Sequence, residues 1–534
     1  MSSEAPTRPD PTAIQATSST STTSFPQVIP PVDSLTLPGR SLVLCFDGTG
    51  DQYDHDNSNI VRFVQLLKKD DKKKQMVYYQ TGIGTGVGAS PQGIIAAKIS
   101  QTLDAMVASG LGNHVRAGYE FLMQNYSDGD RISLFGFSRG AYTARALAGM
   151  LHKVGLLPAY NNEQVPFAYN MFKRDDEEGW KMSCGFKRAF CVDVKIDFVG
   201  VFDTVNSVGI IPRELPFAKS NYLIRVFRHA VALDERRAKF KANLWGRTTD
   251  AEEKLGEAGK KKVYHREKTK GGVWSYVTGW GTEQDQGKNQ DGKKAQGSSH
   301  RGGHDFTASA DRGHQTDVQE VWFAGAHCDV GGGSVRNDTP SSLAGVPLRW
   351  MLRQCFLNNT GILFHSAELE EIGLSPASLW PTVKIPTPIS DGHKLQATDA
   401  TLVESPAQSL EPTSSTTKIN GTGTGTAEVS LIPPQPIKLG SEYDAKDALQ
   451  PIYDQLSIAK WWWILELLPM KQRYQRHDQS WRTWFSANLG GPRVIHGQKR
   501  FKTYVHRSVQ YRMQQLGYKP RAEILAAPGL TWVD

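Results

Sequence analysis

The chain contains few cysteines, and their positions argue against two classes of site. Its 534 residues include five cysteines, at positions 45, 184, 191, 328 and 355. The number is odd and no two of them form a C-x-x-C pair, so neither a disulfide framework nor a zinc knuckle is indicated. A glycine run at 81–88 fits neither the dinucleotide nor the Walker pattern, and no other residues have metal-ligand spacing. We therefore expect no cofactor and no metal, and a cytoplasmic protein in a reducing compartment.

Long apolar runs are also lacking. No window holds the 18 or so apolar residues needed to span a bilayer. Residues 1–37 have no basic start followed by an apolar run, so we expect a disordered Ser/Thr/Pro tail and no secretory signal. The net charge of +8 comes partly from short runs such as 68–74, without interleaved recognition residues. We therefore expect no nucleic-acid partner.

Several apolar runs end abruptly in polar residues. SLVLCF at 41–46 leads into Asp-Gly-Thr-Gly, RISLFGF at 131–137 leads to Ser138, and VGVF leads to Asp203. Segments with helical periodicity separate these runs, as at 59–67 and 93–126. This alternation predicts an α/β fold with a doubly wound, mostly parallel sheet, whose functional residues lie at the carboxyl ends of strands.

Two polar segments divide the chain. Residues 246–316 are rich in Gly, Gln, Lys and Asp, and we expect a disordered insert within a catalytic domain at 38–402. Residues 403–440 have the composition of a linker. The last part, 441–534, is expected to be a mostly helical C-terminal region.

Ser138 is the candidate nucleophile because Gly136-Phe-Ser138-Arg-Gly140 matches G-x-S-x-G. In that motif the serine lies on a strained turn between a strand and a helix, where side chains at the glycine positions would collide. The motif alone is weak, but a strand is expected before it and a helix after it. The alternative is an ordinary serine between structural glycines.

A serine hydroxyl needs a base within hydrogen-bond reach, and the base needs an orienting acid. His327 follows an apolar run and precedes a glycine-rich loop, so it is the preferred base, and Asp203 is the preferred acid. Asp329 is the rival acid. The alternative bases are His229 and His506, which we place on helical or loop segments. His327 could instead be a loop histidine satisfied by the backbone, and either aspartate could cap a helix or turn.

The loop after the first strand is the candidate oxyanion hole. Gly48 and Thr49 could offer a backbone N–H to a developing oxyanion, and Arg139 directly after the nucleophile could offer another. The alternative is a plain turn between a strand and a loop.

AKWWWILELLPMK at 459–471 places three tryptophans and several aliphatic residues between lysines. This composition suits a peripheral membrane contact or a lid over an apolar pocket. A buried helix is the alternative, and we favour it slightly.

Five motifs together resemble a known family. CFDGTG, LFGFSRGAYTARALAGM, FVGVFDTVNSVG, RHAVALDERR and VWFAGAHCDVGGG occur in this order. They are similar to the uncharacterised α/β-hydrolase domain shared with bacterial type VI secretion phospholipase effectors, over about residues 40–365. The resemblance implies an α/β-hydrolase-like fold and a Ser-Asp-His site at Ser138, Asp203 and His327. The polar insert and the Trp-rich C-terminal part depart from the bacterial pattern.

From residues and resemblance together we expect a serine hydrolase that cleaves carboxylic esters, with lipids or phospholipids as substrates. The alternative is a binding or scaffold module that keeps the fold without catalysis.

Overall fold

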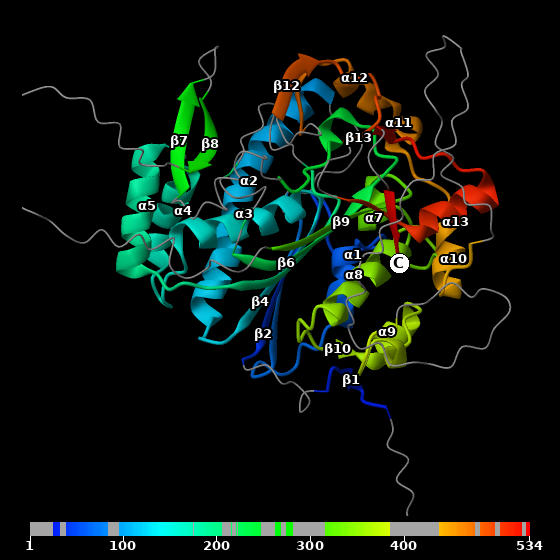
Figure 1. Ribbon diagram of the computed structural model, residues 1–534, viewed down its shortest axis with the longest axis horizontal. Coiled ribbons are helices and arrows are strands. Elements are labelled where there is room, and N and C mark those ends of the chain that lie inside the picture. The colour runs from blue at the N-terminus through cyan, green and yellow to red at the C-terminus, as the bar shows by residue number, and fades with distance from the viewer. Residues whose placement is uncertain are drawn as a thin grey trace, which may run out of the picture.

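The computed structural model describes residues 25–31, 39–83, 96–174, 176–205, 215, 221, 223–246, 262–268, 274–280, 316–384, 437–475, 481–496, 502–525 and 530–534. A parallel sheet runs through the middle of the molecule (Figure 1). Its order is β16-β14-β9-β6-β5-β4-β2-β3, and every neighbouring pair is parallel. The strands are β2 (Ser41–Phe46), β3 (Gln75–Gln80), β4 (Arg131–Phe137), β5 (Ile196–Phe202), β6 (Ile224–Ala232), β9 (Asp317–Phe323), β14 (Thr503–His506) and β16 (Leu530–Val533).

Helices cover both faces of this sheet (Figure 1). Successive side chains of a strand point to opposite faces, so Leu44 of β2 joins one core cluster and Cys45 the other. The first cluster includes residues of α2 (Ala96–Asn125), α3 (Ser138–Val154), α4 (Val165–Lys173) and α5 (Glu177–Phe190). The second includes residues of α1 (Asn59–Leu66), α8 (Gly345–Leu357) and α9 (Ser366–Glu371). All six residues of β2 are buried, as expected for a strand covered on both sides. The predicted doubly wound α/β fold is confirmed.

The chain order of the strands creates a switch point at the carboxyl edge of the sheet. After β2 the chain forms β3 on one side and then crosses to β4 on the other side of β2. Ligands of open α/β sheets bind at the carboxyl ends of strands where the order reverses. The residues that follow β2 and β4 therefore occupy the expected position of a binding site.

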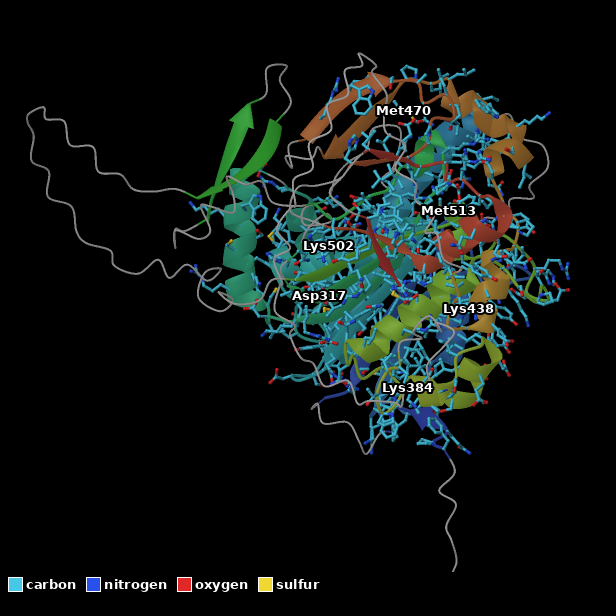
Figure 2. The ribbon with its side chains drawn as sticks, turned by 45° about the vertical axis from the view of Figure 1, so that its right-hand side comes forward. Asp317, Lys384, Lys438, Met470, Lys502 and Met513 are labelled. Atoms are coloured by element: carbon cyan, nitrogen blue, oxygen red, sulfur yellow. The ribbon has the colours of Figure 1, made fainter. Side chains whose placement is uncertain are left out.

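The C-terminal region is not mostly helical, which corrects our expectation. Its helices are α10 (Glu442–Ala448), α11 (Gln455–Ile458), α12 (Trp463–Glu466) and α13 (Arg507–Leu516). Its strands include β14 and β16, which extend the main sheet beyond β9. It also contains the pairs β11 (Met470–Gln475) with β12 (Trp481–Ser486) and β13 (Val494–His496) with β15 (Glu523–Leu525). In Figure 2 this region lies against one side of the molecule, around Lys438, Met470 and Met513.

The segments expected to be disordered also contain some regular structure. In the tail, β1 (Val28–Ile29) pairs with β10 (Phe364–His365) because Ile29 is buried in the core. In the polar insert, β7 (Lys262–Lys268) pairs antiparallel with β8 (Trp274–Trp280), where β-branched and aromatic residues favour strands. The remaining parts of the tail and insert, and the linker up to residue 436, lie outside the described residues.

Five shorter helical elements lie among the described residues. They are the short helix α7 (His327–Gly331) and the single 3-10 turns η2 (Asn162–Gln164), η3 (Ala238–Phe240), η4 (Pro376–Ser378) and η5 (Lys460–Trp462). Among the helices described, none is both long enough and apolar enough to cross a bilayer.

Phe135 tests the packing of the central strand β4. Its ring is fully buried and contacts Phe63 and Phe198, with centroids 4.2 and 5.6 Å away. Phe135→Ala should lower the free energy of unfolding by about 3–5 kcal/mol, since it leaves a cavity. The control is Phe485→Ala, which makes the same chemical change at a side chain that is 74% exposed. Urea denaturation should show a change within about 0.5 kcal/mol for the control; equal losses in both variants would contradict the assigned core.

Candidate active site

Ser138 lies on a tight turn between β4 and α3. Its φ angle of +57° is rare for a residue with a side chain. A Cβ atom on Gly136 would lie 2.6 Å from the Cα atom of Ala141, and one on Gly140 would lie 2.3 Å from the carbonyl oxygens of Phe46 and Asp47. The two glycines are therefore sterically required. Because Gly140 touches the end of β2, the turn also adjoins the loop that follows that strand.

Asp203 and His327 are held together at the same edge of the sheet. Asp203 directly follows β5, the neighbour of β4, and has a φ angle of +37°. His327 begins α7 after β9. The Nδ1 atom of His327 is 2.6 Å from Oδ2 of Asp203, and both side chains are buried. The contact joins the two residues that the sequence analysis names as the preferred base and acid, whose roles remain a prediction.

The tautomer of His327 follows from the charge of its partner. Burial alone would raise the pKa of Asp203, but the Arg493 guanidinium and the hydrogen bond from His327 hold it well below its usual range. An ionised carboxylate only accepts hydrogen bonds, so Nδ1 of His327 carries the proton. Burial lowers the pKa of His327, and its bond to Asp203 offsets that only in part. At neutral pH the imidazole is uncharged and Nε2 has a free lone pair.

Nε2 of His327 is the atom that a base would use. It is buried and makes no hydrogen bond to any residue within the described ranges, Ser138 included. The Phe137 ring lies 4.7 Å from the imidazole, centroid to centroid, and so connects the serine turn to the histidine. In free enzymes the hydrogen bond between a nucleophile and its base is often long, and it shortens in the substrate complex. The arrangement leaves a basic nitrogen unpaired beside the serine turn.

The rival candidates have other hydrogen-bond partners, although Nε2 of His506 is also buried without a partner among the described residues. Oδ2 of Asp329 accepts from the backbone N–H groups of Ala326 and Tyr453, at 2.8 and 2.9 Å, and burial raises its pKa to about 6. His229 lies in β6, where Nδ1 meets Glu320 and Nε2 accepts from Thr204 N–H. His506 ends β14, bonds Ser508, and has a pKa lowered to about 3 by burial. The expectation that both histidines lie on helices or loops is corrected.

The loop after β2 holds the candidate oxyanion donors. The Gly48 N–H donates to Oδ1 of Asp47 at 2.8 Å and is therefore engaged within the loop. Asp47 is buried and also accepts from the hydroxyls of Ser58 and Tyr79, at 2.6 and 2.8 Å. Among the described residues, the hydroxyl of Thr49 has no hydrogen-bond partner. Arg139 lies in the first turn of α3, where backbone N–H groups point out of the helix end.

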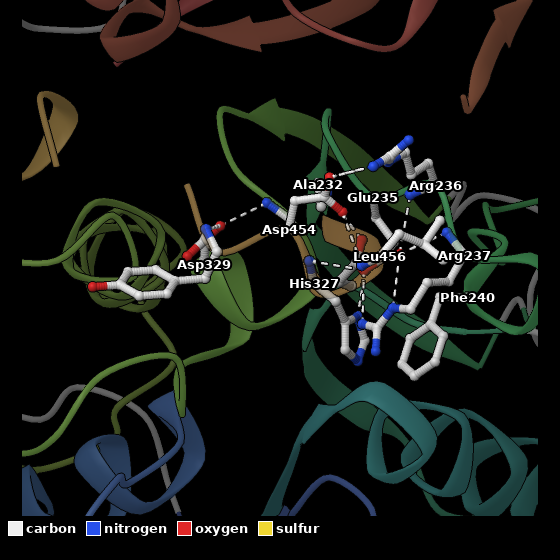
Figure 3. Close-up of polar contacts among 12 residues, drawn as sticks. Ala232, Glu235, Arg236, Arg237, Phe240, His327, Asp329, Asp454 and Leu456 are labelled. Carbon is white, nitrogen blue, oxygen red and sulfur yellow. Dashed lines mark hydrogen bonds and ion pairs between the residues drawn. The ribbon is translucent and has the colours of Figure 1, made fainter. Parts of the chain in front are cut away.

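Two further charged residues, Glu235 and Arg237, lie beside His327, and the sequence analysis did not identify them. The buried carboxylate of Glu235 accepts from the backbone N–H of His327 at 3.2 Å and from Arg237 at 2.8 Å. The Arg237 guanidinium lies 3.5 Å above the Phe240 ring, which meets the imidazole edge-on at 4.8 Å. Figure 3 shows Glu235, Arg237 and Phe240 beside His327, with Asp329 apart from them. The RHAVALDERR motif was the available signal for Glu235 and Arg237.

The comparisons with known proteins identify the family. The profile described as "T6SS, Phospholipase effector Tle1-like, catalytic domain" matches residues 40–354. This chain belongs to that family.

Individual proteins match parts of the chain. The uncharacterized protein YEL023C of Saccharomyces cerevisiae is 39% identical over 219 residues, which cover 38% of this chain and 32% of that protein. A crystal structure of an uncharacterized protein from Pseudomonas aeruginosa is 16% identical with a TM-score of 0.30, over 65% of this chain and 50% of that one. The structure of the Tle1 effector bound to the VgrG spike is 18% identical with a TM-score of 0.24, over 56% and 52%. This chain thus spans a third to a half of these proteins.

The glycine requirement at the serine turn can be tested by adding one methyl group. Gly140→Ala should destabilise the fold by about 1–3 kcal/mol, because its Cβ has no room between two carbonyl oxygens. Gly185→Ala is the matched control, since nothing lies within 4 Å of a Cβ at that position in α5. The control should stabilise the protein by up to about 1 kcal/mol. Urea denaturation measures both, and an unchanged stability for Gly140→Ala would contradict the turn described here.

Proposed function

We propose that the protein is a serine hydrolase that cleaves carboxylic esters of lipids or phospholipids, with Ser138 as nucleophile, His327 as base and Asp203 as orienting acid. One observation carries the proposal. A buried, neutral imidazole is paired with a carboxylate and has an unpaired Nε2, at the sheet edge where a positive-φ serine begins a helix. Strained residues of this kind cluster at functional sites.

The proposed reaction has two acyl-transfer steps. Nε2 of His327 takes the proton of the Ser138 hydroxyl while Oγ attacks the ester carbon, and the carbonyl electron pair moves to its oxygen. The oxyanion is stabilised by backbone N–H groups at Thr49 and Arg139; Gly48 would contribute only if its bond to Asp47 opened. The intermediate then expels the alcohol, which takes the proton back from His327. Water repeats the sequence on the acyl-enzyme and releases the acid.

A lipid substrate is favoured by the walls of the site as well as by the family. The imidazole lies between the rings of Phe137 and Phe240, and Phe240 in turn meets Trp462 edge-on with centroids 5.5 Å apart. Aromatic walls suit an acyl chain better than a polar substrate. Ser138 and His327 are only 4% and 3% exposed, so the reaction would take place largely away from bulk water.

Ser138→Ala tests the nucleophile. The variant should lose ester turnover and labelling by a fluorophosphonate, because the attacking oxygen is removed, while its melting temperature stays near that of the wild type. Ser378→Ala is the control, since Ser378 is a serine of η4 with only a local bond to Ser375. Labelling that survives in Ser138→Ala would show that another residue is the nucleophile. A wild-type protein that binds lipid but reacts with neither probe would favour the binding-module alternative.

The Trp-rich segment supports a second proposal, that the protein docks on lipid surfaces. The preference for a buried helix is wrong, because Trp461 is 51% and Leu467 is 65% exposed. We define the C-terminal apolar patch as these two and the other exposed aliphatic side chains of the same segment, 458–468: Ile458, Trp461, Ile464, Leu467 and Leu468. Clustered exposed apolar side chains mark interaction sites. Trp462 follows Trp461 directly and contacts Phe240, so the patch adjoins the proposed site.

Leu467→Glu tests this docking. Replacing a leucine that enters the lipid by a charge should weaken binding to phosphatidylglycerol vesicles about 10–100-fold, since burying a leucine contributes about 1.5–3 kcal/mol. The control is Leu357→Glu, at a 44% exposed leucine at the end of α8, away from the patch. Vesicle co-sedimentation measures both variants. Equal binding by Leu467→Glu and wild type, or no binding by the wild type, would dismiss the patch as a membrane site.

A further inference from the structure

Arg493 reaches the catalytic acid from outside the family domain. The residue directly precedes β13 and lies far beyond residue 354, where the family match ends. Its side chain is nonetheless buried, 3% exposed, at the carboxyl end of β5. No sequence motif pointed to it, since it follows Asn-Leu-Gly-Gly-Pro in what reads as a surface turn.

The guanidinium of Arg493 donates hydrogen bonds to both carboxylate oxygens of Asp203. Nη1 donates to Oδ1 at 2.6 Å and Nη2 donates to Oδ2 at 2.9 Å, which is the bidentate geometry that a planar guanidinium provides. Two further N–H groups hold the arginine itself, because Nη1 also donates to the Ala232 carbonyl at 2.9 Å and Nη2 to the Phe240 carbonyl at 2.5 Å, whereas Nε has no partner among the described residues. The plane of the carboxylate is therefore held by Arg493 together with the backbone N–H of Ala232, which donates to Oδ1 at 2.9 Å. Oδ2, the oxygen that meets His327, is shared between the two partners.

The C-terminal region is anchored to the same segment by several further contacts. In RHAVALDERR, Asp234 accepts from the Tyr518 hydroxyl at 2.6 Å and Arg236 pairs with Asp454 at 2.7 Å. The backbone N–H of Ala238 donates to Glu466 at 2.6 Å. These contacts join Asp454, Glu466 and Tyr518 to residues 234–238, which follow β6. Arg493 therefore belongs to a C-terminal region that is bound to the RHAVALDERR segment by several contacts.

We propose that Arg493 is a positioning residue of the active site, so that the C-terminal region completes a site which the family domain alone leaves unfinished. The inference rests on the proposed function. Arg493 does not touch the reacting atoms; it orients Asp203 toward His327 and balances the charge of the Asp203–His327 pair. Without a cation, a buried carboxylate beside a neutral imidazole is an uncompensated charge, and the pair takes up a proton at higher pH.

Two substitutions distinguish the effect of losing the bidentate contact to Asp203 from the effect of losing the positive charge of Arg493. Arg493→Gln removes both, so the rate of fluorophosphonate labelling at its optimal pH should fall about 10²-fold, as expected when a reacting group is misplaced. The acid limb of the labelling profile should also move to higher pH. Arg493→Lys keeps the charge but cannot hold both oxygens, so labelling should fall about tenfold with the acid limb unmoved. Rates are expressed per folded molecule, with the folded fraction taken from thermal melting of the full chain.

Arg521→Gln is the matched control, because Arg521 pairs with Asp454 at 2.8 Å in the same docked region without touching Asp203. It should label at the wild-type rate with an unchanged pH profile. The inference is overturned if Arg493→Gln and Arg493→Lys both label like the wild type, or if their losses follow the folded fraction alone with no change in profile. If Arg493→Gln does not fold, wild-type labelling by Arg493→Lys is sufficient to overturn it. A wild-type protein that never labels rejects the proposed function itself, which is a different outcome.

Discussion

The hydrogen bond between Nδ1 of His327 and Oδ2 of Asp203 is the interaction on which the rest of the site depends. It joins the ends of β5 and β9, which are separated in the sheet by β6, and it fixes which imidazole nitrogen carries the proton. Because both groups are buried, the bond lies in a medium of low dielectric, where an unpaired charge is costly and a paired one is strongly held. The free Nε2 is a consequence of this pairing.

The charges around the pair form a balanced cluster. Asp203 faces Arg493, and Glu235 faces Arg237, so two buried carboxylates meet two guanidinium groups around one imidazole. Removing one member of such an ion pair leaves a buried charge without a partner, which destabilises the folded protein. The sheet edge, the RHAVALDERR segment and the C-terminal region are consequently parts of one electrostatic unit.

Much of the fold could be predicted because the decisive residues lie at or within four residues of the carboxyl ends of strands. Ser138, Asp203 and His327 each come after such a strand, and parallel strands bring their carboxyl ends to one edge. The C-terminal strands were missed because β14 and β16 have four residues each and lie at or next to the sheet edge, where burial is partial. Arg493 could not be predicted, since its burial is set by a carboxylate 290 residues away. The tryptophan segment has a composition that fits a buried and an exposed helix equally well.

The most direct test of the account is a crystal structure of the full chain after reaction with a fluorophosphonate. The account predicts phosphorus bonded to Oγ of Ser138, with Nε2 of His327 within about 2.6–3.2 Å of that oxygen. Asp203 should remain bonded to Nδ1. Phosphorus on any other residue, or a His327 imidazole that stays out of reach of Ser138 in the adduct, would contradict it.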